Sequence, residues 1–456
     1  MTNLIQKFRD FFARGPTKKI KLPQPEKEWT FLVYLAGDNN LEDAGIDDID
    51  EMEEAGGSTD TTNVIVQFDR IKGYDPSNAD WTATKRFYIM KGGKPHQIES
   101  VELQDLGETN CGDPKVLENF LLWGVENFPA KYYAVILWNH GSGWKDTDVY
   151  RLVTERLRGF KSPARKMGRN HIISFKSDKI RRTLFNTTIL KSLTFVARGI
   201  AYDDSNQDFL DNLELENVFS KVYKKINRKI DILGMDACLM AMAEVAYQNK
   251  AYVDYVVASA EVEPWDGWPY ELIVKKLNEN PKIVPKEFSK VMVDEYMDSY
   301  AGPDFTYVTL SSIQTTALED LAKAVSKMAT SLTSNIDSYS EQIMDILFDV
   351  LCYYDWDYVD LKNFAELVKE YIPAEASKAE AVMKLVDKAV VEAGGNGAGI
   401  SIYLPSDYYS SLYDGLNWAK ATKWDEFIKA VLKHDLGSRR RVKYNREKEK
   451  TKTVFK

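Results

Sequence analysis

The chain has 456 residues, of which 44% are hydrophobic and 28% charged, and a formal net charge of −9. This length usually exceeds what one hydrophobic core serves, so we expect a main domain and a second unit. The acidic balance argues against a nucleic-acid binder, and the absence of an apolar run of about 18 residues argues against a membrane-spanning protein.

Residues 1–27 are expected to form a lead-in that precedes the folded core. A secretory signal needs an uninterrupted apolar stretch, and this segment does not have one. Its apolar residues are interrupted by Lys7, Arg9, Asp10 and Arg14. We therefore favour a cytoplasmic location, with secretion as the open alternative.

Residues 28–270 show apolar strands that alternate with helices. Residues 30–36 (TFLVYLA) are apolar throughout, as in a parallel strand that is covered on both faces. Helices are expected after residue 40 and over 113–129. Further strands are expected at 62–69, 85–90 (antiparallel and near an edge) and 253–261, and the runs 131–144 and 229–238 are each expected to be a strand that ends in a polar turn. The pattern predicts an α/β fold with a mostly parallel sheet flanked by helices.

The rest of the chain differs in character. Residues 271–435 are largely helical in pattern, with a strand that returns near 399–404. Residues 436–456 form a charged tail, which we interpret as a solvated extension. No feature indicates an oligomer, so a monomer is expected.

Residues 145–199 form a strongly basic insertion within the α/β core. By count its charge is about +10 in a protein that is acidic overall. Loops of this length inside a compact domain are usually functional. The alternative is a cationic surface insertion that binds an acidic partner.

Two candidate catalytic residues follow predicted strands. His140 lies where the strand of the run 131–144 gives way to a polar turn, and Cys238 lies at the end of the run 229–238. Reactive groups gather beyond the carboxyl ends of parallel strands, so the two side chains should meet there. A helix that begins directly after Cys238 would favour the thiolate. Gly141 would let a backbone N–H approach a substrate carbonyl.

The alternatives for these two residues are an inert core thiol and a plain turn. Cys111 lies in a turn that no strand precedes and is interpreted as structural, and Cys352 lies in an aromatic run and is interpreted as packing. Three scattered cysteines are too few for a disulfide framework or a zinc site, so no metal ligands are assigned.

Several blocks of the sequence together resemble the clostripain family of caspase-like cysteine peptidases (clan CD, peptidase family C11). The resemblance runs from about residue 28 to 430, with residues 145–199 its weakest part. The matching blocks are VYLAGDNNLE (33–42), WNHGSGW (138–144), AYDDS (201–205), LGMDACLMAMAEVAYQ (233–248), EVEPWDGWPY (261–270), DLKNF (360–364) and GISIYLP (399–405).

The resemblance implies a caspase/haemoglobinase-like fold and a cysteine endopeptidase (EC 3.4.22) that cleaves peptides after Arg or Lys. Cys238 would be the nucleophile and His140 its acid–base partner. The backbone N–H groups of Gly141 and Cys238 would form the oxyanion hole. Asp236 and Asp266 would line the specificity pocket. The structural alternatives are a helix-start carboxylate for Asp236 and a turn residue for Asp266.

Family members are made as inactive single chains and cut themselves after a basic residue, which gives the segment 145–199 a role as an activation loop. No cofactor is expected to be required. Some members depend on calcium, and the acidic blocks EDAGIDDIDEMEE and YDDSNQD could supply oxygen ligands, although neither has EF-hand spacing.

The alternative function is a catalytically silent caspase-like module that binds basic peptides or a partner protein. A nucleic-acid binder that uses the basic segment and tail lacks aromatic interleaving and any recognised module. The presence of both Cys238 and His140 favours the enzyme.

Overall fold

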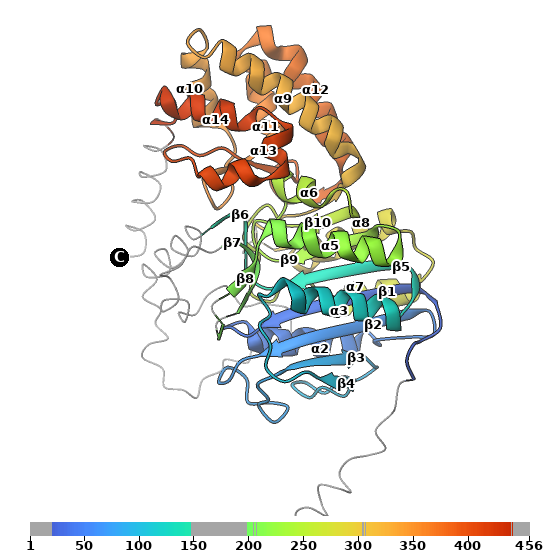
Figure 1. Ribbon diagram of the computed structural model, residues 1–456. Helices are drawn as coiled ribbons and strands as arrows, with labels where there is room; N and C mark the ends of the chain where they lie inside the picture. The colour runs from blue at the N-terminus through green and yellow to red at the C-terminus, as the bar shows by residue number, and fades with distance from the viewer. Residues whose placement is uncertain are drawn as a thin grey trace, which may run out of the picture.

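The centre of the protein is a mostly parallel sheet (Figure 1). The structure, a computed structural model, describes residues 21–146 and 198–440, apart from residues 204, 207, 303, 304, 306 and 439. In this part of the chain the main sheet has nine strands. The parallel ones are β1 (Lys27–Gly37), β2 (Thr62–Arg70), β5 (Ala130–Trp138), β9 (Ile230–Asp236) and β10 (Val253–Ala258). Their order is β10-β9-β5-β1-β2.

Antiparallel strands extend both edges of the sheet. They are β3 (Thr84–Tyr88) and β4 (Val101–Asp105) beside β2, and β11 (Leu310–Gln314) and β13 (Val390–Gly394) beside β10. The predicted antiparallel strand near an edge is thus confirmed as β3. Two strands beyond residue 270 join the main sheet, so the later part of the chain contributes to it.

Helices cover both faces of the sheet because its inner strands are apolar on both sides. Along β1, Leu32 and Tyr34 face one core, whereas Phe31 and Val33 face the other. The first face carries α3 (Pro114–Asn127) and α5 (Asn212–Ile226), and the second carries α2 (Glu42–Glu54), α7 (Tyr270–Glu279) and α8 (Pro285–Ser299). The predicted α/β fold with a flanked, mostly parallel sheet is confirmed.

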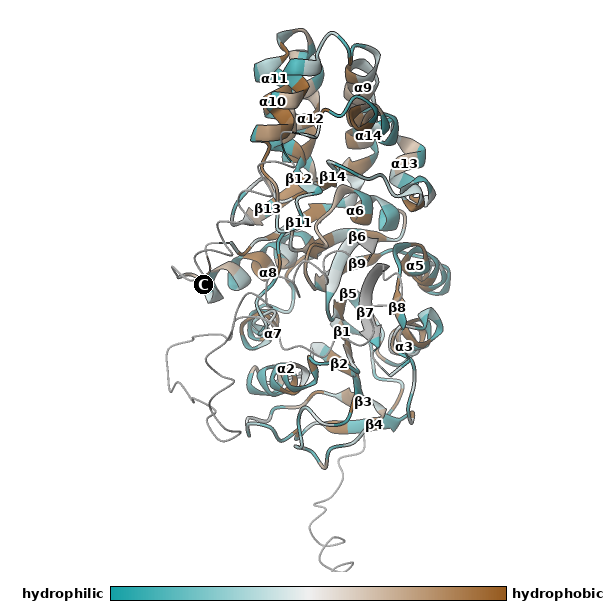
Figure 2. Cartoon of the chain, turned by 90° about the vertical axis from the view of Figure 1, so that its left-hand side faces the viewer, coloured by the Kyte–Doolittle hydropathy of each residue, from teal (hydrophilic) through white to brown (hydrophobic). Residues whose placement is uncertain are grey.

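The C-terminal part is largely helical, as predicted, and packs beyond one edge of the sheet (Figure 2). Its helices are α9 (Leu318–Ser334), α10 (Ser340–Asp349), α11 (Leu361–Tyr371), α12 (Ala376–Ala389), α13 (Asn417–Ala421) and α14 (Trp424–Lys433), with 3-10 turns at Thr315–Ala317, Pro373–Glu375 and Ser411–Gly415. A short sheet joins β12 (Tyr358–Asp360) to β14 (Ser401–Tyr403), the predicted returning strand. Among all the described helices, none is long and apolar enough to span a bilayer.

A second small sheet lies beside the carboxyl ends of the main strands. It contains β6 (Gly141–Asp146), β7 (Arg198–Asp203) and β8 (Asp208–Leu210), in antiparallel order. The basic insertion predicted over 145–199 connects β6 to β7, and its residues 147–197 lie outside the described residues. So do residues 1–20 of the lead-in and residues 441–456 of the tail.

One local prediction is wrong. The helix expected to start directly after Cys238 is α6 (Ala243–Asn249), which begins five residues after it. The intervening backbone turns at Cys238 and Leu239 and is then held by neighbouring segments: the N–H of Leu239 donates to the Glu261 carbonyl at 3.0 Å, and the N–H of Ala241 donates to the Ser259 carbonyl at 2.8 Å. Leu239 itself has a φ of 65°, which no helix allows.

Candidate active site

The two predicted catalytic residues emerge from adjacent parallel strands. In the register of β5 with β9, Trp138 lies opposite Asp236. His140 and Cys238 each follow two residues later, so both reach the same edge of the sheet. They line one small pocket that is open to solvent. Its other lining residues are Leu41, Trp138, Asn139, Asp236, Ala237, Glu263, Pro264, Trp265 and Gly267.

Gly141 packs directly against the backbone of Cys238. A Cβ atom at position 141 would lie 2.5 Å from the carbonyl oxygen of Cys238 and 3.1 Å from its nitrogen. Both contacts are with backbone atoms, which cannot rotate away, so only glycine fits here. The backbones of the two residues predicted to form an oxyanion hole are therefore neighbours.

The thiol of Cys238 is partly buried beneath the loop that follows β10. The backbone N–H of Glu263 donates to its Sγ at 3.3 Å. Burial, aided by the nearby carboxylates of Glu263 and Asp236, raises the pKa of Cys238 to about 12. The expectation of a thiolate favoured by a helix dipole is therefore wrong, because α6 starts too late and the local charges are negative. The resting group is a neutral thiol.

His140 is a buried, neutral imidazole. It is 7% exposed, and burial lowers its pKa to about 4. Its Nε2 lies 3.0 Å from Oδ1 of Asn40. An amide oxygen can only accept a hydrogen bond, so Nε2 carries the ring proton and Nδ1 carries the lone pair. A neutral ring with one lone pair can accept a proton from a thiol.

Asn40 is held in place by a turn at the end of β1. Asn39 donates from Nδ2 to the Ala36 carbonyl at 2.8 Å, and its Oδ1 accepts from the N–H of Leu41 at 2.8 Å. The next residue, Glu42, forms a fully buried ion pair with Arg70 at 2.5 Å.

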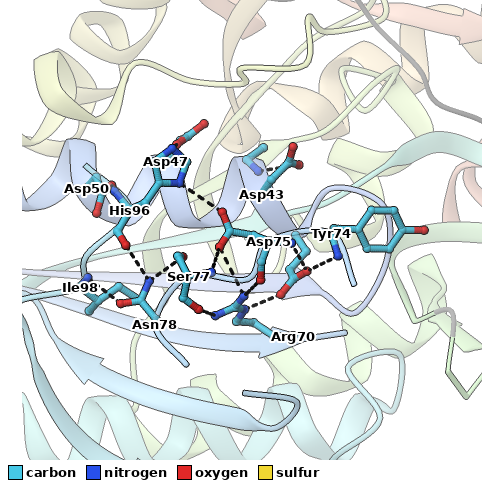
Figure 3. A network of polar contacts seen from close by, with 12 residues as sticks. Asp43, Asp47, Asp50, Arg70, Tyr74, Asp75, Ser77, Asn78, His96 and Ile98 are labelled. Carbon is cyan, nitrogen blue, oxygen red and sulfur yellow. Dashed lines mark hydrogen bonds and ion pairs between the residues drawn. The ribbon is translucent and has the colours of Figure 1, made fainter. Parts of the chain in front are cut away.

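Arg70 in turn holds the loop that follows β2. It donates to the carbonyl of Asp75 at 2.6 Å and to that of Ser77 at 3.3 Å. Figure 3 shows these contacts and, beside them, His96 facing Asp75 at 3.2 Å. This network fixes the start of α2 and thereby the position of Asn40.

Two buried carboxyl groups form the acidic wall of the pocket. Asp236 accepts from the N–H of Trp268 at 3.2 Å and from the hydroxyl of Tyr270 at 2.9 Å. Glu263 accepts from Nε1 of Trp268 at 3.3 Å. Burial, together with the neighbouring Asp236 carboxylate, raises the pKa of Glu263 well above its usual range. In the resting pocket Glu263 therefore keeps a proton beside Asp236.

The structure brings Asp236 to the pocket but not Asp266. Asp266 lies in the adjacent turn, is half-buried, and is not among the described residues that line the pocket. Sequence reasoning missed two residues that do contact the site, Glu263 and Asn40. Both lie in stretches of sequence that resemble the family, EVEPWDGWPY and VYLAGDNNLE. The sequence therefore indicated the two segments but not the individual residues.

The fold and the pocket together define the class of protein. A flanked, mostly parallel sheet that presents a cysteine and a histidine from neighbouring strand ends is the arrangement of a caspase-like cysteine peptidase.

Comparisons with known proteins give the family. Residues 33–161 and 188–431 match the model of the clostripain family, peptidase C11. Clostripain from Hathewaya histolytica is 24% identical over 449 residues, which cover 84% of this chain and 76% of that protein. The chain belongs to the clostripain family and is a cysteine-type endopeptidase, a hydrolase of peptide or protein substrates.

Solved structures share the fold. A secreted C11 cysteine protease from Bacteroides thetaiotaomicron, in complex with an irreversible peptide inhibitor, has a TM-score of 0.58 at 20% identity and covers 88% of this chain and 99% of that chain. An inactive zymogen C11 protease from Parabacteroides distasonis has a TM-score of 0.57 at 17% identity, with the same two coverages.

Proposed function

We propose that this enzyme cleaves peptide bonds after Arg or Lys with a Cys238–His140 dyad, and that it is activated by self-cleavage between the strands that carry these two residues. The observation that carries the proposal is the shared pocket: thiol, imidazole and two buried carboxyl groups line one cavity. No Lys or Arg is found among its described lining residues.

In this reaction His140 acts first as a base and then as an acid. Its Nδ1 takes the thiol proton while Sγ of Cys238 bonds to the scissile carbonyl carbon. The N–H groups of Gly141 and Cys238 stabilise the negative charge on the oxygen. As the C–N bond breaks, the proton passes to the leaving amine. Water then hydrolyses the thioester, and its proton returns through His140 to the sulfur.

Both partners are neutral before substrate binds, which suits this order of events. A pKa near 12 for Cys238 and near 4 for His140 leaves no thiolate–imidazolium pair at pH 7. Proton transfer then accompanies the attack on the carbonyl instead of preceding it.

The acidic wall supports a preference for a cationic side chain. An arginine or lysine that enters the pocket would pass its methylene groups along Trp138 and Trp265 and meet Asp236 and Glu263. The arriving cation would displace the proton that Glu263 holds, so two carboxylates would face one positive charge. The substrate-binding role predicted for Asp266 remains a prediction.

The ends of the basic insertion support self-cleavage. β6 and β7 are paired, with Gly141 opposite Ile200 and Asp146 opposite Arg198. A cut within residues 147–197 would leave both new ends attached to a sheet that begins at Gly141. The segment itself offers many Arg and Lys side chains to an acidic pocket.

The test compares the parent enzyme with Cys238→Ala and His140→Ala variants, and with Cys352→Ala as a matched control for a half-buried thiol outside the pocket. Turnover of fluorogenic peptides that end in Arg, Lys or Asp is measured, together with the intact mass of each chain. We expect turnover after Arg or Lys and cleavage between residues 145 and 199 in the parent and Cys352→Ala only.

Turnover after Asp, or cleavage and turnover that persist in Cys238→Ala, would overturn the proposal. An inert, uncut parent, tested with reductant and calcium, would instead support a silent module that binds basic peptides. A variant in which every Arg and Lys of the insertion is replaced tests self-activation separately from the catalytic dyad. If this variant stays uncut and is fully active, self-activation is contradicted and the Cys238–His140 dyad is not.

A further inference from the structure

The C-terminal part of the chain reaches back to the segment that carries Gly141. Residues 141–143, with the sequence Gly-Ser-Gly, begin β6 directly after His140. Figure 2 shows β12 and β14 between β6 and the helices of the C-terminal part. The hydroxyl of Tyr358, the first residue of β12, donates to the backbone carbonyl of Ser142 at 2.7 Å, and both residues are fully buried. A side chain from the C-terminal part thus holds a peptide group beside the catalytic histidine.

The Gly-Ser-Gly segment has little to restrain it from within. Glycine has no side chain that limits its backbone dihedrals, and here two glycines flank Ser142. Gly143 has a φ of 72°, a conformation that suits glycine. A donor from outside the segment can fix the direction of the Ser142 carbonyl, and the buried hydroxyl of Tyr358 is such a donor.

The ring of Tyr358 restrains the same backbone from the side. A Cβ atom at position 143 would lie 3.0 Å from Cε2 of Tyr358, 3.0 Å from the carbonyl oxygen of Leu239 and 2.5 Å from Sδ of Met242. Gly143 is therefore enclosed between the tyrosine ring and the segment that follows Cys238. The hydroxyl and the ring act together on residues 142 and 143.

Tyr358 is itself held in place by its backbone. Its N–H donates to the Asp355 carbonyl at 2.8 Å, and its carbonyl accepts from the N–H of Tyr353 at 2.9 Å. As part of β12 it also lies opposite Tyr403 of β14. The hydroxyl of Tyr358 therefore has a fixed position in the C-terminal part.

β14 contacts the other strand end of the active site. The N–H of Ser401, the first residue of β14, donates to the carbonyl of Ala241 at 2.9 Å, three residues after Cys238. Because β12 and β14 are paired, one small sheet contacts the backbone that follows Gly141 and the backbone that follows Cys238. These are the two residues whose N–H groups would form the oxyanion hole.

We propose that Tyr358 is a positioning residue for the oxyanion hole: its hydroxyl fixes residues 141–143 so that the N–H of Gly141 points to the place where negative charge develops. This inference rests on the proposed function, which supplies Gly141 and Cys238 as the donors. Such donors act through their fixed direction, and a small displacement lowers the rate steeply. Tyr358 is not among the described residues that line the pocket, so substrate affinity should not depend on its hydroxyl.

The experiment compares the parent enzyme with Tyr358→Phe, which keeps the ring and removes the hydroxyl. Tyr353→Phe is the matched control, because this buried hydroxyl bonds Asp360 at 2.8 Å in the same segment of the chain. Thermal unfolding establishes that both variants are folded. With Arg or Lys peptides, Tyr358→Phe should lower kcat about 10- to 100-fold with KM changed by less than about threefold, and Tyr353→Phe should follow the parent.

Two further measurements separate positioning from a merely structural role. A peptide aldehyde that ends in argininal adds the thiol of Cys238 at its carbonyl carbon, and the oxygen of this adduct would occupy the oxyanion hole. Iodoacetamide alkylates the same thiol without forming an oxyanion. In Tyr358→Phe the Ki of the aldehyde should rise by about the same factor as kcat falls, whereas the alkylation rate should change by less than about twofold.

A folded Tyr358→Phe with the kcat and the aldehyde affinity of the parent overturns the inference. So does a variant whose alkylation rate falls as much as its kcat, since the thiol itself would then be disturbed. If Tyr358→Phe does not fold, Asn212→Ala decides by the same measurements, because Nδ2 of Asn212 donates to the Gly143 carbonyl at 3.3 Å. An inert parent removes the proposed function and this inference together, whereas an active parent with a parent-like Tyr358→Phe removes the inference alone.

Discussion

Oδ1 of Asn40 accepts a hydrogen bond from Nε2 of His140 at 3.0 Å, which orients the imidazole and fixes its tautomer. Asn40 contacts the ring from a turn after β1, whereas His140 follows β5, the next strand of the sheet. The proposed base is thus positioned by a residue that does not itself contact the reacting atoms. This makes Asn40 a positioning residue.

Asn40→Ala should lower kcat by about 10- to 100-fold with little change in KM, because the ring loses its orientation but the substrate pocket is intact. Asn40→Asp should restore much of the rate. Its carboxylate would raise the pKa of His140 from about 4, so the acid limb of the pH profile should move to higher pH. Steady-state kinetics from pH 4 to 8 measure both effects. An unchanged acid limb in Asn40→Asp would show that Asn40 does not act through the ring.

The sequence predicted the strands better than it predicted the contacts between them. The apolar segments that precede His140 and Cys238 form the neighbouring strands β5 and β9. They could be predicted because a continuous apolar run indicates a strand that is buried on both faces. The start of α6 could not be predicted from the local sequence, since Leu239 and Ala241 are held out of a helix by hydrogen bonds to the carbonyls of Glu261 and Ser259.

The choice between acidic residues of one loop was also beyond the sequence. Glu263 and Asp266 are three residues apart and equally polar, yet only Glu263 turns into the pocket. The loop turns at Gly267, which has a φ of 56°, and nothing in the local sequence indicates which of the two side chains points inward. The same holds for Asn39 and Asn40, of which one closes the turn and the other reaches His140.

Glu263→Gln should lower kcat/KM for Arg and Lys peptides by about 10- to 100-fold, because the pocket loses a carboxylate that faces the bound cation. Asp266→Asn is the matched control and should change it by less than about threefold. In the parent, kcat/KM for these peptides should rise with pH. The raised pKa of Glu263 keeps its carboxyl protonated in the empty pocket, and the loss of this proton on binding of the cation becomes easier at higher pH. A large loss in Asp266→Asn with none in Glu263→Gln would reassign the second acidic residue to Asp266.

Gly141→Ala should lower kcat/KM by about 100- to 1000-fold, the range seen when one oxyanion donor is lost. The new Cβ would sit 2.5 Å from the Cys238 carbonyl oxygen and force the two backbones apart. Gly415→Ala serves as the control, since no heavy atom lies within 4 Å of a Cβ built there. Circular dichroism establishes that both variants are folded before rates are compared. Parent-like kinetics in folded Gly141→Ala would remove Gly141 from the oxyanion hole.

The last prediction concerns stability and pH at Glu244, where α6 meets the C-terminal part. Its carboxyl is fully buried: Oε1 accepts from the N–H of Tyr403 at 3.0 Å and from the hydroxyl of Tyr413 at 2.7 Å. Burial raises its pKa from 4.5 to about 7. The folded state therefore holds a proton that the unfolded chain releases at lower pH. This contribution to stability is complete below about pH 4.5 and is lost as the pH rises through 7.

Between pH 5 and pH 8 the parent should lose about 2 to 3 kcal/mol of unfolding free energy from this group, because the pKa difference is about 2.5 units and each unit is worth about 1.4 kcal/mol. Glu244→Gln cannot ionise, so any fixed cost of its amide applies equally at both pH values and cancels in the comparison. Urea unfolding at pH 5 and pH 8 measures the difference, with exposed Glu341→Gln as the control that should follow the parent. If Glu244→Gln loses as much stability as the parent over this interval, another group titrates, and the carboxyl at the junction of α6 with the C-terminal part is not the one that responds to pH.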